Sequence, residues 1–167
     1  MIPSWALLIS FWLHMLATVA WLGGLAALAL FVFPSMRRTL KPKDYAVWAD
    51  ALNRKLDPIG WFSLGLLIFT GLLQMDGNSN YDGFLSLSNP WAVAIFLKHI
   101  VFFGMIAVSA VLTWGVAPAL SRAALSRARG ATDGQEEAIL RRFQALIALN
   151  LLLGLLVLVF TAMARVA

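Results

Sequence analysis

Three titratable side chains lie inside long apolar stretches of the sequence: His14, Lys98 and His99. Such groups are costly within a membrane, where they usually pair with another group or serve a function. Neutral imidazole is a good ligand for iron, copper and zinc. A neighbouring lysine can pair with a haem propionate, extend its ammonium to the membrane surface, or act as a ligand itself. These residue types predict metal or haem chemistry within the apolar part of the chain.

The spacing of the two histidines predicts that they lie at a similar depth. Ser4 and Asn89-Pro90 are residue types that commonly begin helices. Each histidine follows its helix start by ten residues, which is roughly 15 Å along a helix axis. Two imidazoles at one level can bind a metal ion, or clasp haem b between the first and third helices. Lys98, one residue before His99, is the alternative axial ligand.

The composition places these residues in a membrane protein. Of the 167 residues, 61% are hydrophobic and 13% are charged, whereas soluble domains are about 45–50% apolar and about 25% charged. A chain this short cannot bury so many apolar side chains in a soluble core. Soluble enzymes, disordered tails and nucleic-acid-binding modules are therefore excluded. The prediction is an all-α, integral membrane four-helix bundle forming a single domain over 1–167, with helices at about 5–33, 59–75, 91–120 and 143–163.

The basic residues predict the orientation of this bundle. Lysine and arginine gather in the segments 37–55 and 122–142, while the amino terminus and the loop 76–90 have none. Cytoplasmic loops are enriched in these residues, so both termini are expected on the outer, periplasmic side. The sequence pI of about 10.3 is then a signal of orientation, and nucleic acid is not expected as a partner. The expected partners are the lipid bilayer and other membrane subunits.

The segment 43–57 predicts a separate short helix. Tyr45, Trp48, Leu52 and Leu56 are spaced by three, four and four residues, which places them on one helical face. Such a helix is expected to lie on the cytoplasmic membrane surface. The glycine-flanked segment 130–134 predicts a break before the fourth helix.

The methionines offer a second metal chemistry. The chain has no cysteine, so the soft thioether of methionine is the sulfur ligand left for Cu(I). Met75 and Met163 fall at the outer ends of the second and fourth helices, and with His14 and His99 they form a candidate set of transient copper ligands. Structural roles are the alternative, because scattered methionines fill gaps in packing and histidines can simply join helices. Asn150 is expected to donate such an interhelical hydrogen bond.

The chain resembles the copper resistance D (CopD-like) family of membrane domains. The resemblance is carried by six short motifs: Leu13-His14-Met15-Leu16, Trp21-Leu22-Gly23-Gly24-Leu25 with Pro34, Phe62-Ser63, Phe69-Thr70-Gly71, Asn89-Pro90-Trp91 and Leu97-Lys98. A more distant resemblance is to haem-binding membrane proteins of the HemJ type, which share the histidine in helix 1 and the later lysine. Both imply a four-helix unit of the bacterial inner membrane that handles copper or binds haem. His14 and Lys98 match the family pattern, and His99 is an addition of this chain.

Three functions follow from these features. The first is haem b binding by His14 and His99 for electron transfer, or as a subunit of a redox complex, because bis-histidine ligation leaves no open position on the iron. The second is copper transport or resistance through His14, His99, Met75 and Met163. The third is a structural accessory subunit of a membrane complex.

Overall fold

The computed structural model describes residues 2–40, 42–128 and 136–167. Every regular element in these ranges is helical. Four helical rods are long and apolar enough to cross a membrane: Ser4–Thr39, Val47–Asp76, Pro90–Ala123 and Glu137–Val166. The chain is thus a multi-pass membrane protein, and the predicted all-α class with four spans is confirmed.

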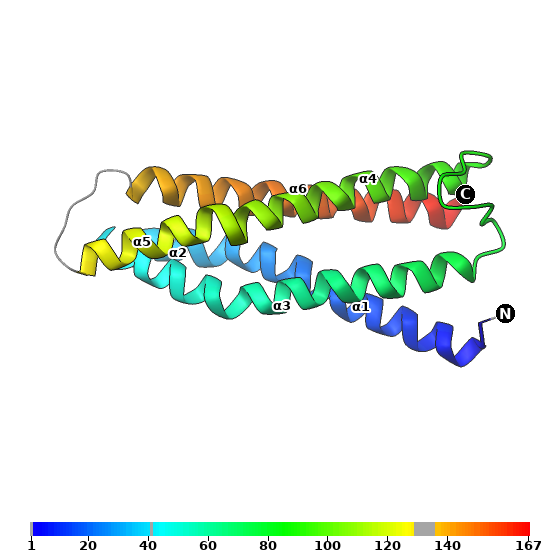
Figure 1. The fold of residues 1–167 in the computed structure, drawn as a ribbon, viewed down its shortest axis with the longest axis horizontal. Coiled ribbons are helices and arrows are strands. Elements are labelled where there is room, and N and C mark those ends of the chain that lie inside the picture. The colour runs from blue at the N-terminus through cyan, green and yellow to red at the C-terminus, as the bar shows by residue number, and fades with distance from the viewer. Residues whose placement is uncertain (1, 41, 129–135) are drawn as a thin grey trace.

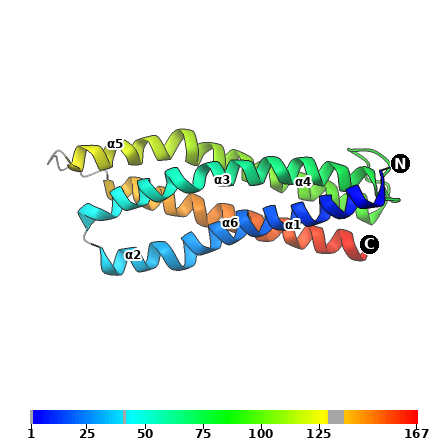
Figure 2. The same ribbon diagram turned by 90° about the horizontal axis from the view of Figure 1, so that it is seen from below.

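The four rods run side by side along one long axis, with both termini at the same end (Figures 1 and 2). We call this the terminal end. The opposite end, which we call the basic end, carries Arg37, Arg38, Lys55, Arg122, Arg141 and Arg142. The assignment of the basic end to the cytoplasm remains a prediction based on these charges.

Two of the rods contain a π-helical segment. The first rod consists of α1 (Ser4–Ala26), η1 (Ala27–Val32) and α2 (Phe33–Thr39), and the third of α4 (Pro90–Ala110), η2 (Val111–Val116) and α5 (Ala117–Ala128). Each π segment is followed by a proline, Pro34 or Pro118. A wider π turn makes room for the proline ring and compensates for its missing N–H, as is usual in membrane helices. Both rods therefore continue past the predicted ends at 33 and 120.

The predicted start of the third rod is confirmed in detail. The side-chain oxygen of Asn89 accepts a hydrogen bond from the backbone N–H of Ala92 at 2.8 Å, and Pro90 is the first helical residue. Ser4 also begins its helix, but the capping position belongs to Pro3, which makes no side-chain cap bond.

The prediction of a separate surface helix over 43–57 is wrong. Helix α3 is one element, Pro42–Asp76, and it passes through Pro58. Tyr45 and Ala49 are buried in the core near the basic end, which holds this part of α3 in line with the bundle. Trp48, expected on the same face as Tyr45, is 59% exposed. The predicted helical spacing of these residues was correct. The neighbouring helices, however, cover Tyr45 and leave Trp48 uncovered.

Tyr45 also joins α3 to α6 (Glu136–Val166), because the side-chain amide of Gln144 donates a hydrogen bond to its hydroxyl. Burial raises the pKa of the Tyr45 phenol, while this hydrogen bond and the charge of Arg37 act in the opposite direction. Helix α6 extends beyond the predicted 143–163 at both ends. The predicted break at 130–134 lies outside the described residues.

The rods associate mainly as two pairs, α1 with α3 and α4 with α6. Towards the basic end the pairs share one core, which includes Phe33, Leu120 and Phe143. Within the second pair, the fully buried Asn150 donates a hydrogen bond to Ser109 Oγ at 2.9 Å. The predicted interhelical role of Asn150 is confirmed.

Candidate functional site

His14 is held on α1 by a contact from α3. Its Nδ1 lies 2.7 Å from Oγ1 of Thr70, and that hydroxyl also lies 2.6 Å from the carbonyl oxygen of Leu66. The single hydroxyl proton of Thr70 is donated to Leu66, so the hydroxyl accepts from His14 Nδ1–H. This arrangement selects one tautomer of His14, in which Nε2 keeps its lone pair for a ligand. Gly71 lies beside the ring, because a Cβ there would be in ordinary van der Waals contact with Cε1 of His14 at 3.6 Å.

Further hydrogen bonds hold α1 and α3 together around His14. Ser10 Oγ donates to the carbonyl of Thr70 at 3.1 Å, and Gln74 Nε2 donates to the carbonyl of Ser10 at 3.3 Å. Thr18 Oγ1 donates to the carbonyl of His14 itself at 2.8 Å. The histidine is therefore part of a polar contact between helices and is not an isolated side chain in an apolar surface.

His99 is fixed in the same tautomer by a different partner. Its Nδ1 lies 2.7 Å from the carbonyl oxygen of Ile95, which can only accept a hydrogen bond. Nε2 of His99 therefore also carries a lone pair. The ring packs edge-on against Phe84 from the loop between α3 and α4, with the ring centroids 5.1 Å apart. Lys98 is half-buried and lies within electrostatic range of both imidazoles.

The predicted ligands are distributed over both helix pairs. His14 contacts α3, whereas His99 and Lys98 lie on α4, which packs mainly against α6. Met75 is buried beside Trp91 at the terminal end, while Met163 is 48% exposed. In the parts of the chain that the structure describes, no three His, Asp or Glu side chains converge on one point.

Asp57 is a further titratable group inside a span, and it was not among the candidate residues predicted from the sequence. It was assigned to the surface segment 43–57, but it lies within Val47–Asp76. Thr113 Oγ1 donates to Asp57 Oδ1 at 2.6 Å, and Trp61 Nε1 donates to Thr113 Oγ1 at 3.0 Å. Asp57 could have been recognised from its position directly before Pro58, because a membrane helix can continue through a proline.

The comparisons with known proteins identify the family. The family model for copper resistance protein D, CopD, matches residues 50–164, which is about two thirds of the chain. The matched range includes Asp57, Lys98 and His99, and His14 precedes it. No curated protein and no solved structure matches the chain. The resemblance seen in the sequence is confirmed: the chain belongs to the copper resistance protein D (CopD) family.

Proposed function

We propose that this protein carries copper ions through the bacterial inner membrane, with His14 and His99 as ligands in the half of the bundle nearer the terminal end. Membership of the copper resistance D family supports copper as the cargo. The observation that carries the proposal is the fixed tautomer of both imidazoles. Each Nδ1–H is donated to an oxygen of the protein, at 2.7 Å in both cases. Each Nε2 is then ready to bind a metal without first losing a proton.

The partners of Nδ1 resemble the outer shell of many protein metal sites. A metal-binding histidine usually donates its second ring N–H to an oxygen that fixes the ring and makes it more basic. Thr70 and the Ile95 carbonyl have this position.

The charge on Lys98 links copper binding to protonation. An ammonium group and a copper ion repel one another strongly where little water screens their charges. Lys98 lies within electrostatic range of both histidines. Copper binding at the imidazoles is therefore favoured when Lys98 releases its proton or turns away. The lysine thereby couples metal entry to proton exit.

Met75 and Met163 complete the proposed route at the terminal end. Thioether sulfur is a soft ligand that selects Cu(I). The half-exposed Met163 would meet an arriving ion first, and Met75, buried beside Trp91, would bind it next. With the basic end in the cytoplasm, this entrance faces the periplasm.

Haem b is the second candidate, and the helix pairing favours it. His14 and His99 belong to different pairs of rods, and each has the free Nε2 that axial ligation requires. The two imidazoles would hold the iron, and Lys98 would pair with a propionate. A bound haem would supply one-electron chemistry. The protein would then transfer electrons alone or as a subunit of a larger complex.

The test uses the full-length protein purified in lipid nanodiscs and in proteoliposomes. We expect Cu(I) binding in competition with a chromophoric chelator, copper uptake into proteoliposomes, and loss of both in His14→Ala and His99→Ala. Met15→Ala is the matched control, because Met15 adjoins His14 but is 67% exposed. A reduced-minus-oxidised spectrum with a sharp α-band would instead support haem. Unchanged copper binding in both histidine variants would overturn the ligand roles of His14 and His99. Neither copper binding nor a haem spectrum in the native protein would leave only the accessory-subunit function.

A further inference from the structure

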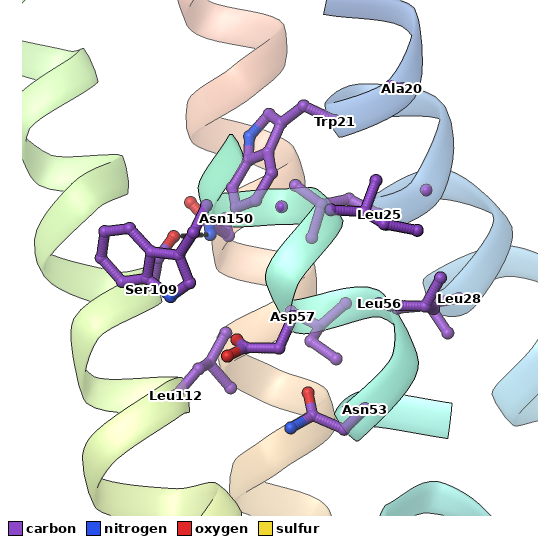
Figure 3. A pocket seen from close by; sticks show the side chains of 15 residues that line it. Ala20, Trp21, Leu25, Leu28, Asn53, Leu56, Asp57, Ser109, Leu112 and Asn150 are labelled. Carbon is purple, nitrogen blue, oxygen red and sulfur yellow. Dashed lines mark hydrogen bonds between the residues drawn. The ribbon is translucent and has the colours of Figure 1, made fainter. Parts of the chain in front are cut away.

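A cavity lined mainly by apolar side chains, with a few polar groups among them, lies in the middle of the bundle (Figure 3). Its lining on the first and third rods begins at Ala20 and Ser109, further along each rod from the terminal end than His14 and His99. Its volume is about 90 Å³, and all four rods contribute to its wall. The residues that matter here are Trp21, Asn53, Asp57, Ser109, Leu112 and Asn150. Both π segments border it, through Leu28 of η1 and Leu112 of η2. The copper ligands proposed above do not line it, so the inference is independent of copper.

Two buried polar atoms at this cavity lack a partner among the described residues: Trp21 Nε1 and Asn150 Oδ1. Asn150 is fully buried, and its amide nitrogen already donates to Ser109. Ser109 in turn donates to the carbonyl of Met105 at 2.8 Å. Leaving a buried donor or acceptor unpaired costs about 1–3 kcal/mol. Both atoms therefore need a hydrogen-bond partner from outside the chain.

The chemistry of the two atoms identifies this ligand. Trp21 Nε1 can only donate a hydrogen bond, and Asn150 Oδ1 can only accept one. A cation would satisfy Asn150 and leave Trp21 unpaired, whereas an anion would do the reverse. Water both accepts and donates, and the cavity has room for several molecules. We propose that ordered water fills this cavity and forms the basic-end half of an aqueous path that ends at Trp21.

The polar residues between Trp21 and the basic end support such a path. Asn53 and Asp57 lie one turn apart on α3, and Figure 3 shows both side chains pointing from α3 towards the rod that carries Ser109 and Leu112. Asp57 uses one oxygen to accept from Thr113, so its second oxygen can accept from water. Nearer the basic end, Ser121 donates to Asp50 at 2.5 Å. Polar side chains thus continue from the cavity to the surface.

Trp21 closes the path on the other side. Its ring lies so close to the α3 backbone that a Cβ on Gly60 would be 2.6 Å from Trp21 Cζ3. The next polar group on α1 towards the terminal end is Thr18, whose hydroxyl is bonded to His14. The indole therefore separates the water from the histidine region.

The first experiment detects the water directly. Hydroxyl radicals made by X-ray pulses in ¹⁸O-water oxidise side chains beside bound water in the full-length protein in nanodiscs. We expect ¹⁸O label on Trp21 and Leu112 at least tenfold faster than on Leu64, which is 2% exposed and off the cavity. Asn150→Leu should slow the labelling of Trp21, and Thr161→Leu on the exposed face of α6 should not. Labelling of Trp21 as slow as that of Leu64, or no response to Asn150→Leu, would overturn the proposal.

The second experiment tests where the path opens. The chain has no cysteine, so single-cysteine variants can be probed with a membrane-impermeant thiol reagent in intact cells and inverted vesicles. Asn53→Cys should react only from the side that labels Lys55→Cys, and never from the side that labels Ser79→Cys. Reaction from the Ser79→Cys side, or from neither side, contradicts an opening at the basic end. A change in Trp21 labelling when Na⁺ and K⁺ are replaced by a bulky organic cation would mean that a cation is the occupant, contrary to the proposal.

Discussion

Thr70 of α3 holds the imidazole of His14 on α1 through a contact of 2.7 Å between Oγ1 and Nδ1. Because Thr70 gives its own proton to the Leu66 carbonyl at 2.6 Å, this contact also decides which ring nitrogen of His14 is protonated. The helix pair α1–α3 therefore leaves the lone pair on Nε2 of His14, which is the state that the proposed copper binding requires.

Thr70→Val removes the hydroxyl while keeping the shape of the side chain. We expect the Cu(I) affinity to fall by about 10- to 100-fold, which is the usual effect of losing such a partner. Thr70→Ser should retain the affinity. The control is Ser63→Ala, since Ser63 is buried on the same helix and also bonds a carbonyl four residues back, without touching a histidine. An affinity of Thr70→Val equal to that of the native protein would contradict the role of Thr70.

Lys98→Gln removes the positive charge near both imidazoles. We expect Cu(I) to bind about tenfold more tightly at pH 7, which corresponds to about 1.4 kcal/mol, because the repulsion is gone. The affinity should also depend less on pH. Lys98→Arg keeps a charge that no longer titrates, so it should bind no more tightly than the native protein. Chelator competition between pH 6 and 9 measures both effects, and unchanged affinity in Lys98→Gln would count against the coupling.

The buried pair of Ser109 and Asn150 should stabilise the packing of α4 on α6. Hydrogen bonds between membrane helices contribute about 0.6 kcal/mol on average and about 1.7 kcal/mol at most. We expect a coupling free energy in this range from a double-mutant cycle of Ser109→Ala and Asn150→Ala, measured by unfolding in mixed micelles. Ser109→Ala and Thr161→Ala should show no coupling, because Thr161 bonds only the carbonyl of Val157 on its own helix. Additive effects of Ser109→Ala and Asn150→Ala would exclude the predicted stabilisation.

Gly60→Ala should destabilise the protein through Trp21. The added Cβ would lie 2.6 Å from Cζ3 of the indole, which forces the ring to shift at a cost of about 1–3 kcal/mol. Gly65→Ala is the control on the same helix, because a Cβ there meets nothing within 4 Å. Gly60→Ala should therefore have a lower free energy of unfolding than Gly65→Ala. Trp21→Phe should restore part of the stability that Gly60→Ala loses. Equal stability of the two alanine variants would rule out the close contact.

Most of the fold could be predicted from apolar length alone. Four long runs in a membrane leave helices as the simplest solution, and Asn89-Pro90 marked one helix start correctly. The continuity of α3 could not be predicted, because Lys55 and Asp57 looked like residues of a separate helix on the membrane surface. Tertiary packing decided the outcome: Tyr45 and Ala49 are buried against other helices, and this extends the helix through Pro58.

The candidate site could be predicted only in part. His14, Lys98 and His99 were recognisable because titratable groups stand out in apolar sequence. Their partners were not, since Thr70 is 56 residues from His14 in the sequence and Ile95 contributes only a backbone carbonyl. The cavity at Trp21 and Asn150 likewise depends on how four rods meet, and no local pattern encodes that geometry.

The most direct test of copper binding by the two histidines is X-ray absorption at the copper edge of the Cu(I)-loaded, full-length protein. We expect the outer-shell scattering of two imidazole rings, reduced to one ring in His14→Ala and in His99→Ala. A native spectrum without imidazole scattering, or one that neither substitution alters, would contradict copper binding by the two histidines.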